Sequence, residues 1–140
     1  MPLIISLRNF LLKCPFLAPF DGVPGGDPRI YVDYQTGNPT AYSLSLIPTT
    51  PWVRKYTDGG GVKQAVFVFR SIDEYAGRDI VTNMDNIAFF ERLEQWLEST
   101  RPDVPSWNKV EVLSNGYFFD VAEGEDRASY QIQCRVLYTV

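Results

Sequence analysis

The 140-residue sequence contains no histidine, and this absence excludes more functions than any motif in it supports. Histidine is the commonest general base, the commonest metal ligand and the usual partner of a nucleophilic serine or cysteine. The two cysteines, Cys14 and Cys134, lie far apart in sequence and cannot complete a tetrahedral zinc site by themselves. We therefore expect two reduced, buried thiols, no catalytic residue, no cofactor and no bound metal.

Long apolar runs and blocks of like charge are also missing. The N-terminal stretch MPLIISLRNFLLKCPFL is interrupted by Arg8, Asn9 and Lys13, so it does not match a signal peptide, and no run approaches the roughly 18 apolar residues of a membrane span. A net charge of −4 without a basic block argues against binding to the outside of a nucleic-acid duplex, although an acidic protein can surround DNA that slides through it. We expect a chain that starts at Met1, is made in the cytosol and does not contact a membrane.

Aromatic residues are abundant, at 14% of the chain. Tyrosine and tryptophan are favoured at protein–protein interfaces because they combine apolar area with a polar group. Six of them fall on predicted strands or loop edges and are candidates for an exposed interface, although some could instead belong to the core: Tyr31, Tyr34, Trp52, Tyr56, Trp107 and Tyr117.

The hydrophobic pattern predicts one domain, residues 1–140, of the α+β class. Helical spacing predicts a short helix over 3–13 and an amphipathic helix over 85–98 with Asp85 as its N-cap. The remaining apolar and alternating runs predict strands at 29–34, 41–47, 52–57, 62–71, 107–114, 117–122 and 127–140. Segment 62–71 has apolar residues on both sides, which predicts a central strand covered on both faces. We expect a mainly antiparallel sheet with both helices packed on it, on one face.

The segment YTDGGGVKQAVFVF (56–69) raises the question of a phosphate-binding loop. A Walker loop requires GxxxxGK[ST] followed by a helix, whereas here Lys63 is not followed by Ser or Thr and the next segment is a predicted strand. We interpret Asp58, Gly59, Gly60 and Gly61 as a hairpin turn joining 52–57 to 62–70. Three glycines exceed what a tight turn requires, so this tip is a candidate contact with another subunit.

Two other turns are predicted. Asn-Gly at 115–116 is a strong signal for a tight turn between strands. An acidic run, Asp120, Glu123, Glu125 and Asp126, matches the spacing of a calcium loop poorly, so we interpret it as a solvated turn.

Several segments in order resemble a known family: FLLKCP (10–15), KYTDGGGVKQAVFVFRSIDEY (55–75), NIAFFERLEQWLE (86–98) and KVEVLSNGYFFDVAEGEDRASYQIQCRVLY (109–138). Together they resemble the tail-terminator or minor capsid proteins of long-tailed (siphovirus-type) bacteriophages and prophages of Gram-positive bacteria. The resemblance covers roughly residues 5–139. Residues 15–28 are richer in proline and glycine than this family leads us to expect.

The resemblance implies a tail-terminator-like fold and a non-enzymatic role in the virion, in the tail or neck. Six copies would form a ring on the last ring of the tail tube, end its polymerisation and face the head–tail connector or stopper protein. Genomic DNA would pass through the lumen without specific binding. The implied interface is the hairpin with Trp52, Tyr56, Asp58, Gly59, Gly60 and Gly61, and the loop 15–28 is a second candidate.

Two other functions remain open from the sequence. The first is a head-completion, stopper or other neck protein, which would share the ring symmetry but contact the portal side. The second is a small non-enzymatic binding module that holds a ligand in an apolar cleft or a peptide on an exposed edge strand.

Overall fold

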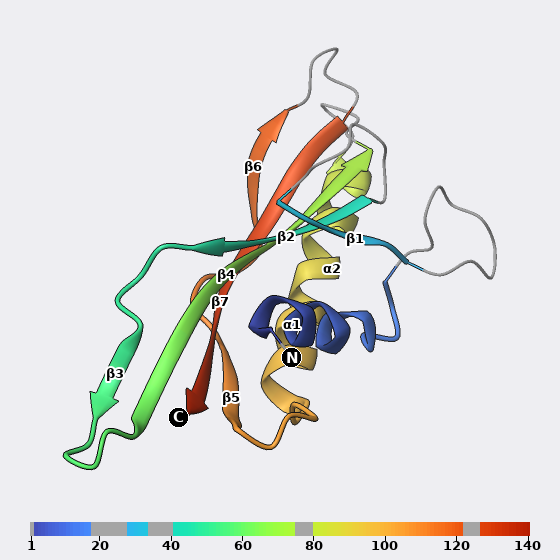
Figure 1. Cartoon of the computed structure of the whole chain (residues 1–140). Helices are drawn as coiled ribbons and strands as arrows, with labels where there is room; N and C mark the ends of the chain where they lie inside the picture. The colour runs from blue at the N-terminus through green and yellow to red at the C-terminus, as the bar shows by residue number, and fades with distance from the viewer. Residues whose placement is uncertain (1, 18–27, 34–40, 75–79, 122–126) are drawn as a thin grey trace.

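A computed structural model describes residues 2–17, 28–33, 41–74, 80–121 and 127–140. The described part contains two helices and a mostly antiparallel sheet, which confirms the α+β class (Figure 1). The elements are α1 (Leu3–Leu12), β1 (Ile30–Val32), β2 (Ala41–Ile47), β3 (Trp52–Lys55), β4 (Gly61–Glu74), α2 (Ile80–Ser99), β5 (Trp107–Val112), β6 (Tyr117–Val121) and β7 (Arg127–Thr139).

Two long antiparallel strands, β4 and β7, form the centre of the sheet and pair along their whole length. On the outer side of β4, β2 pairs with its C-terminal part and β3 with its N-terminal end. On the outer side of β7, β6 pairs with its N-terminal part and β5 with its C-terminal part. Strand β1 adds a short parallel edge next to β2, which the sequence did not predict as parallel.

Each flanking pair therefore behaves as one strand with an interruption. Pro48 and Pro51 lie between β2 and β3, where proline cannot donate to the ladder. Between β5 and β6, the amides of Leu113 and Ser114 both donate to the carbonyl of Gln133, at 2.8 and 3.1 Å. The predicted Asn-Gly turn is thus wrong as a hairpin, because β5 and β6 pair with β7 and not with each other.

Glycine is required at position 116, between β5 and β6, because the backbone there passes close to α2. A Cβ atom added there would lie 2.2 Å from the Cβ of Phe90 on α2, so the backbone between β5 and β6 passes directly against the helix. Only glycine allows such a close approach without displacing its neighbour.

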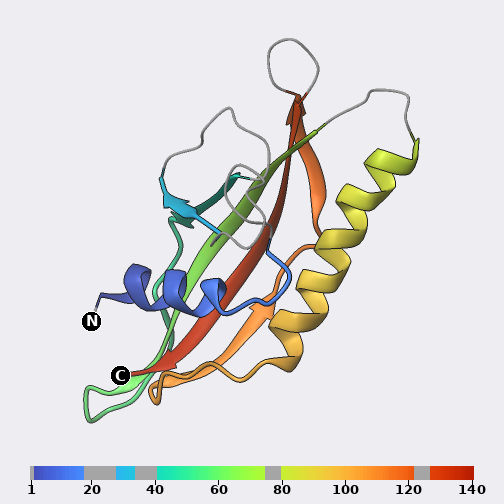
Figure 2. The same cartoon turned by 90° about the vertical axis from the view of Figure 1, so that its right-hand side faces the viewer.

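Both helices lie on the same face of the sheet (Figure 2). The inward side chains of the long strands are fully buried beneath them, including Phe67 and Phe69 of β4 and Ile132 and Val136 of β7. The inward register predicted for 127–140 is therefore confirmed from Tyr130 to Val136.

Aromatic rings connect α2 with α1 and with Phe16, which follows α1. The ring centroids of Phe10 and Trp96 are 5.1 Å apart, and those of Phe16 and Phe89 are 5.9 Å apart. The guanidinium of Arg92 lies 4.5 Å above the ring of Phe16. These contacts fix the flank of α2 that faces α1.

Two sequence expectations need correction. Helix α2 begins at Ile80, so Asp85 lies inside the helix and is not its N-cap. No described helix or strand covers the second face of the sheet, although Val68 on that face is 6% exposed. Val68 is flanked by Ser45 and Gln133 in the register, so its burial reflects the central position of β4 and not a second layer of helices.

Candidate interaction surface: the β3–β4 hairpin

The β3–β4 hairpin extends past the helices at one end of the sheet (Figure 1). Its tip is closed by a backbone hydrogen bond from the Tyr56 amide to the Gly60 carbonyl, at 2.7 Å, and by one from the Gly59 amide to the Tyr56 carbonyl, at 3.1 Å. Gly59 has φ +94°, which is the left-handed conformation that favours glycine. The strand 61–74 follows directly, so the interpretation of 58–61 as a hairpin turn is confirmed.

Asp58 has a structural role in this turn. Its Oδ1 accepts a hydrogen bond from the Gly60 amide at 2.9 Å, and the side chain stays exposed. Short side-chain contacts of this kind hold the backbone of a turn in place.

Next to the turn, Gly61 is held by backbone hydrogen bonds and by close backbone packing. The Gly61 amide and carbonyl both bond to Val140, at 3.2 and 2.9 Å. A Cβ atom on Gly61 would lie 2.1 Å from the carbonyl oxygen of Arg54, so any side chain here would push β3 away from β4. The three glycines therefore have separate roles. Gly59 adopts the left-handed conformation, the Gly60 amide binds the Asp58 side chain, and Gly61 allows β3 and β4 to pack closely.

A cluster of basic side chains surrounds Trp52. The ammonium groups of Lys55 and Lys63 lie 5.1 and 4.7 Å from the centroid of its ring. The register pairs Trp52 with Lys63, Lys55 with Gly61 and Arg54 with Val62, so the two lysines lie on the helix-bearing side of the sheet and Arg54 on the other. None of the three cations forms an ion pair with a carboxylate in the described part of the chain.

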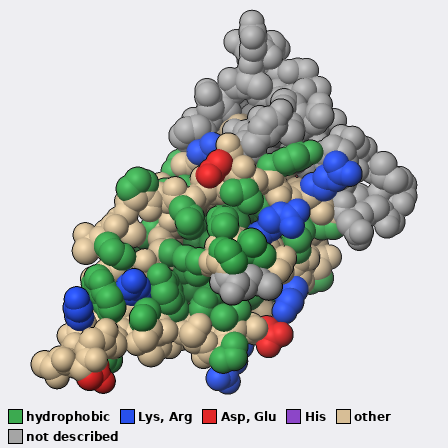
Figure 3. Space-filling view, in the orientation of Figure 1, with side chains coloured by type: hydrophobic (Ala, Val, Ile, Leu, Met, Phe, Trp, Pro, Cys, Tyr) green, Lys and Arg blue, Asp and Glu red, His purple; other side chains and the backbone are tan. Residues whose placement is uncertain are grey.

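Apolar side chains lie exposed beside these cations. Val53 is 52% exposed and Tyr56 46% exposed. In Figure 3 the hairpin lies at lower left and shows Lys and Arg side chains next to hydrophobic ones, with an acidic side chain near its tip. Cations beside exposed apolar and aromatic groups are typical of a surface that contacts another protein.

The residues predicted for an interface meet different outcomes. Trp52, Tyr56, Asp58 and the glycines 59–61 all belong to this one hairpin. Tyr117 is 36% exposed and Tyr31 is half-buried, but Trp107 is 8% exposed and packs in the core with its ring 6.2 Å from that of Phe10, so its prediction as an exposed residue is wrong. Tyr34 lies outside the described residues, as do most of the loop 15–28 and the acidic residues 123–126.

Sequence reasoning missed the basic part of the surface. Arg54, Lys55 and Lys63 are separated by the glycine turn and are not a run of like charge, so no charge-block criterion finds them. The available signal was the hairpin itself, because strands joined by a tight turn bring residues on either side of it together.

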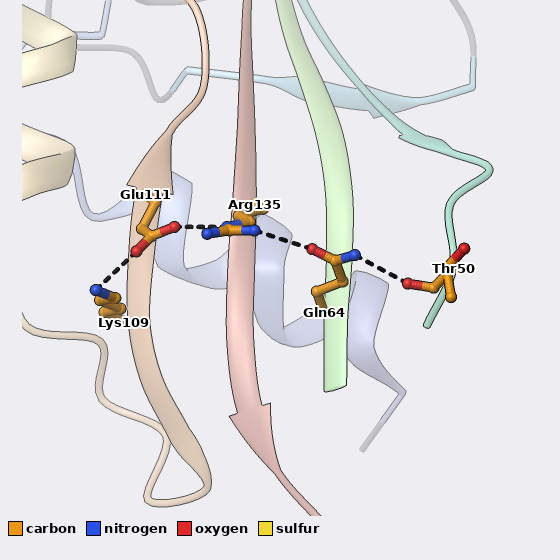
Figure 4. A network of polar contacts seen from close by, with 5 residues as sticks. All are labelled: Thr50, Gln64, Lys109, Glu111 and Arg135. Atoms are coloured by element: carbon orange, nitrogen blue, oxygen red, sulfur yellow. Dashed lines mark hydrogen bonds and ion pairs between the residues drawn. The ribbon is translucent and has the colours of Figure 1, made fainter. Parts of the chain in front are cut away.

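A chain of polar contacts crosses the uncovered face of the sheet (Figure 4). The Arg135 side chain donates to Glu111, with Nε 2.5 Å from Oε2, and to Oε1 of Gln64, 3.2 Å from Nη1. Lys109 also pairs with Glu111 at 2.7 Å, and Gln64 donates to the Thr50 carbonyl at 2.9 Å. The Lys109 ammonium, followed by Arg135, lowers the pKa of the Glu111 carboxyl. These groups are held by one another across three strands.

Arg70, Gln131 and Tyr117 form a second polar cluster on the same face. Arg70 donates to Gln131 at 3.0 and 2.7 Å, and Gln131 in turn donates to the Tyr117 hydroxyl. The polar side chains of these two clusters on the uncovered face are therefore hydrogen-bonded to one another.

The cysteines match the expectation of buried, unpaired thiols. Burial is the main cause that raises the pKa of both thiols, and the pKa of Cys134 reaches about 12. A thiol with so high a pKa is a poor nucleophile at neutral pH. No cluster of acidic or cysteine side chains suited to a metal ion occurs within the described ranges.

Two depressions border the helices. One, of about 280 Å³, lies between the end of α2 and β5 and includes Glu98 and Lys109, and the other, of about 290 Å³, lies between α1 and Val104. Both are below the roughly 300–1,000 Å³ of typical small-molecule sites. Neither helix of the described part is both long and apolar enough to cross a membrane.

Comparisons with protein-family models, with curated proteins and with solved structures find no match to this chain.

Proposed function

We propose that this chain is a structural virion protein, a tail terminator that forms a closed ring on the end of the tail tube. Six subunits is the number that the family resemblance implies. The ring ends tube polymerisation and presents a surface to the head–tail connector, without catalytic activity. It is assembled in the cytoplasm of the host bacterium and remains in the virion where tail and neck join.

The observation that carries this proposal is the β3–β4 hairpin. It extends beyond the helices with Val53 and Tyr56 exposed and with cations that lack an ion-pair partner in the described part. An unpaired sheet edge with exposed apolar side chains beside it is a surface on which another chain can pack. A neighbouring subunit that covers the hairpin accounts for its composition.

The net charge supports the same role. A chain with net charge −4 repels DNA phosphates when it lines a channel, which allows the genome to pass without being held.

The proposal is tested by capping of tail tubes. Tail-tube protein of the same virus is polymerised with and without this chain, and tube lengths and tube ends are examined by negative-stain electron microscopy. We expect short tubes that carry a ring at one end. Tubes of unchanged length with bare ends would contradict the proposal, and rings that bind only the portal side would replace it with a neck or stopper function.

A further inference from the structure

The charge of the hairpin is opposite to that of the rest of the chain. Residues 52–63 carry three basic residues and one acidic residue, which gives net +2, whereas the whole chain has net charge −4. The single acid, Asp58, is already bonded to the turn backbone. The hairpin therefore presents a local positive surface on an acidic protein.

An acidic stripe runs along α2. Glu91, Glu94 and Glu98 follow one another at spacings of three and four residues, which places them in one line along the helix. None of the three forms an ion pair with a described residue. The same line continues toward the start of the helix with Met84, 61% exposed, and Ile87, 44% exposed. We call these five residues the α2 stripe.

The α2 stripe faces away from α1. On the opposite flank of the helix, Trp96 contacts Phe10 of α1, and Phe89 and Arg92 contact Phe16, which follows α1. Glu98 borders the same depression as Lys109 and Val110 of β5, together with Arg101. Lys109 is already paired with Glu111. The stripe thus lies beside the β5 edge of the sheet.

The hairpin and the α2 stripe lie at opposite edges of the molecule. The strand order is β1-β2-β4-β7-β5, with β3 on the same side of β4 as β2, so β3 and β5 are on opposite sides of the sheet. Lys55 and Lys63 lie on the helix-bearing side, which is also the side of α2 (Figure 2). Two molecules placed side by side, with their layers aligned, bring the hairpin of one next to the Glu98 end of the stripe of the other, which borders β5.

We propose that the β3–β4 hairpin of one copy docks on the α2 stripe of the next copy. Lys55 and Lys63 face the glutamates of the stripe, Glu91, Glu94 and Glu98. The contact is heterologous, and such contacts produce closed rings or open filaments depending on the rotation between copies. The inference rests on the proposed function only in that the tail tube selects the closed ring.

A charge-reversal experiment tests this contact. Variant A is Lys55→Glu/Lys63→Glu, and variant B is Glu91→Lys/Glu98→Lys. Each variant alone places like charges on both sides of the contact, so we expect its self-association to weaken about tenfold or more. In a 1:1 mixture every contact is again between opposite charges, and we expect association to return to within about threefold of wild type.

The measurement is sedimentation velocity over a concentration series at low and high salt, because an ionic contact weakens with ionic strength. Lys13→Glu, at the residue after α1, is the single-site control for Lys63→Glu. It changes the net charge equally, lies outside the contact and disturbs only an exposed ion pair with Asp103. Circular dichroism melts show that each variant is folded.

Three results overturn the inference: variants A and B that associate like wild type, a mixture that stays dissociated, or a wild-type chain that remains monomeric at low salt up to millimolar concentration. Capping of tubes in any of these cases leaves the proposed function standing with a different contact. If the chain associates through these charges but does not cap tubes, the contact is supported and the terminator role is wrong.

Discussion

The two halves of strand β4 differ in what surrounds them. Phe67 and Phe69 in the C-terminal half are fully buried under both helices. The N-terminal half begins at Gly61 and Lys63, beyond the helices, and pairs with β3, whose Val53 side chain is 52% exposed. The same continuous strand thus supports the core at one end and a surface at the other. Stability and interaction can therefore be changed separately by mutation in one strand.

The largest effect is expected in the buried half. Phe69→Ala removes a ring that stacks on Tyr42 with centroids 5.3 Å apart and leaves a cavity under the helices. Such truncations cost about 3–5 kcal/mol of unfolding free energy. Urea denaturation followed by circular dichroism measures this loss. A cost below about 1 kcal/mol would mean that this half is not the main core.

Gly116→Ala is expected to have the next largest effect. The added methyl group would lie 2.2 Å from the Phe90 Cβ, so either α2 or the segment between β5 and β6 must move. Overpacking of this kind costs about 1–3 kcal/mol. The same urea titration measures it. A cost below about 0.5 kcal/mol would mean that α2 moves away from this segment without loss of packing.

Sequence reasoning succeeded where the signal was local. The alternation in 41–47 and 127–140, the amphipathic pattern of 85–98 and the glycine turn each predicted an element that the structure contains. Sequence reasoning failed where a contact between residues far apart in the sequence determines the burial of a side chain or the pairing of a strand. Trp107 follows Pro105 and Ser106 and has the pattern of an exposed strand edge, yet it is buried against Phe10 from the other end of the chain. The Asn-Gly pair has the pattern of a hairpin, but both flanking strands find a better partner in the long strand β7.

In the β3–β4 hairpin, too, local features were predicted and features that depend on strand pairing were not. The turn and Trp52 were predicted from the sequence, whereas the basic cluster around the Trp52 ring exists only because β3 and β4 pair in one register. A shift of the β3–β4 register by one residue would move Trp52 to the face of the sheet opposite Lys63.

A smaller effect on stability is expected at the turn that precedes the exposed half of β4. Gly59→Ala meets no atom within 4 Å, so its cost comes only from the left-handed backbone at φ +94°. We expect a loss of about 1 kcal/mol in urea denaturation. Because the strain is confined to the tip, native-state hydrogen exchange should show faster exchange in the hairpin amides and unchanged exchange in β7. Equal acceleration in both would mean that the two halves of β4 are not separable.

The smallest effect concerns Glu111, on the uncovered face beside Arg135 and Gln64. Its folded-state pKa is lowered from 4.5, by Lys109 first and then by Arg135. A lowered folded-state pKa gives stability that is present above the unfolded-state value and is lost as the pH falls through the folded-state value. Glu111→Gln should therefore cost about 0.5 kcal/mol at pH 7, as is typical of partly exposed ion pairs.

The difference between wild type and Glu111→Gln should shrink as the pH falls below 4.5 and disappear at lower pH. Denaturation at a series of pH values from 7 to 3 measures this difference. Glu91→Gln is the matched control with no expected change at pH 7, because Glu91 is exposed, lies away from the helix ends and has no described ion-pair partner. If both variants change stability equally, the effect reports net charge and not the contact across the sheet. If only Glu111→Gln responds, the polar chain through Gln64 adds to the pairing of the strands just where β4 passes from its buried half to its exposed half.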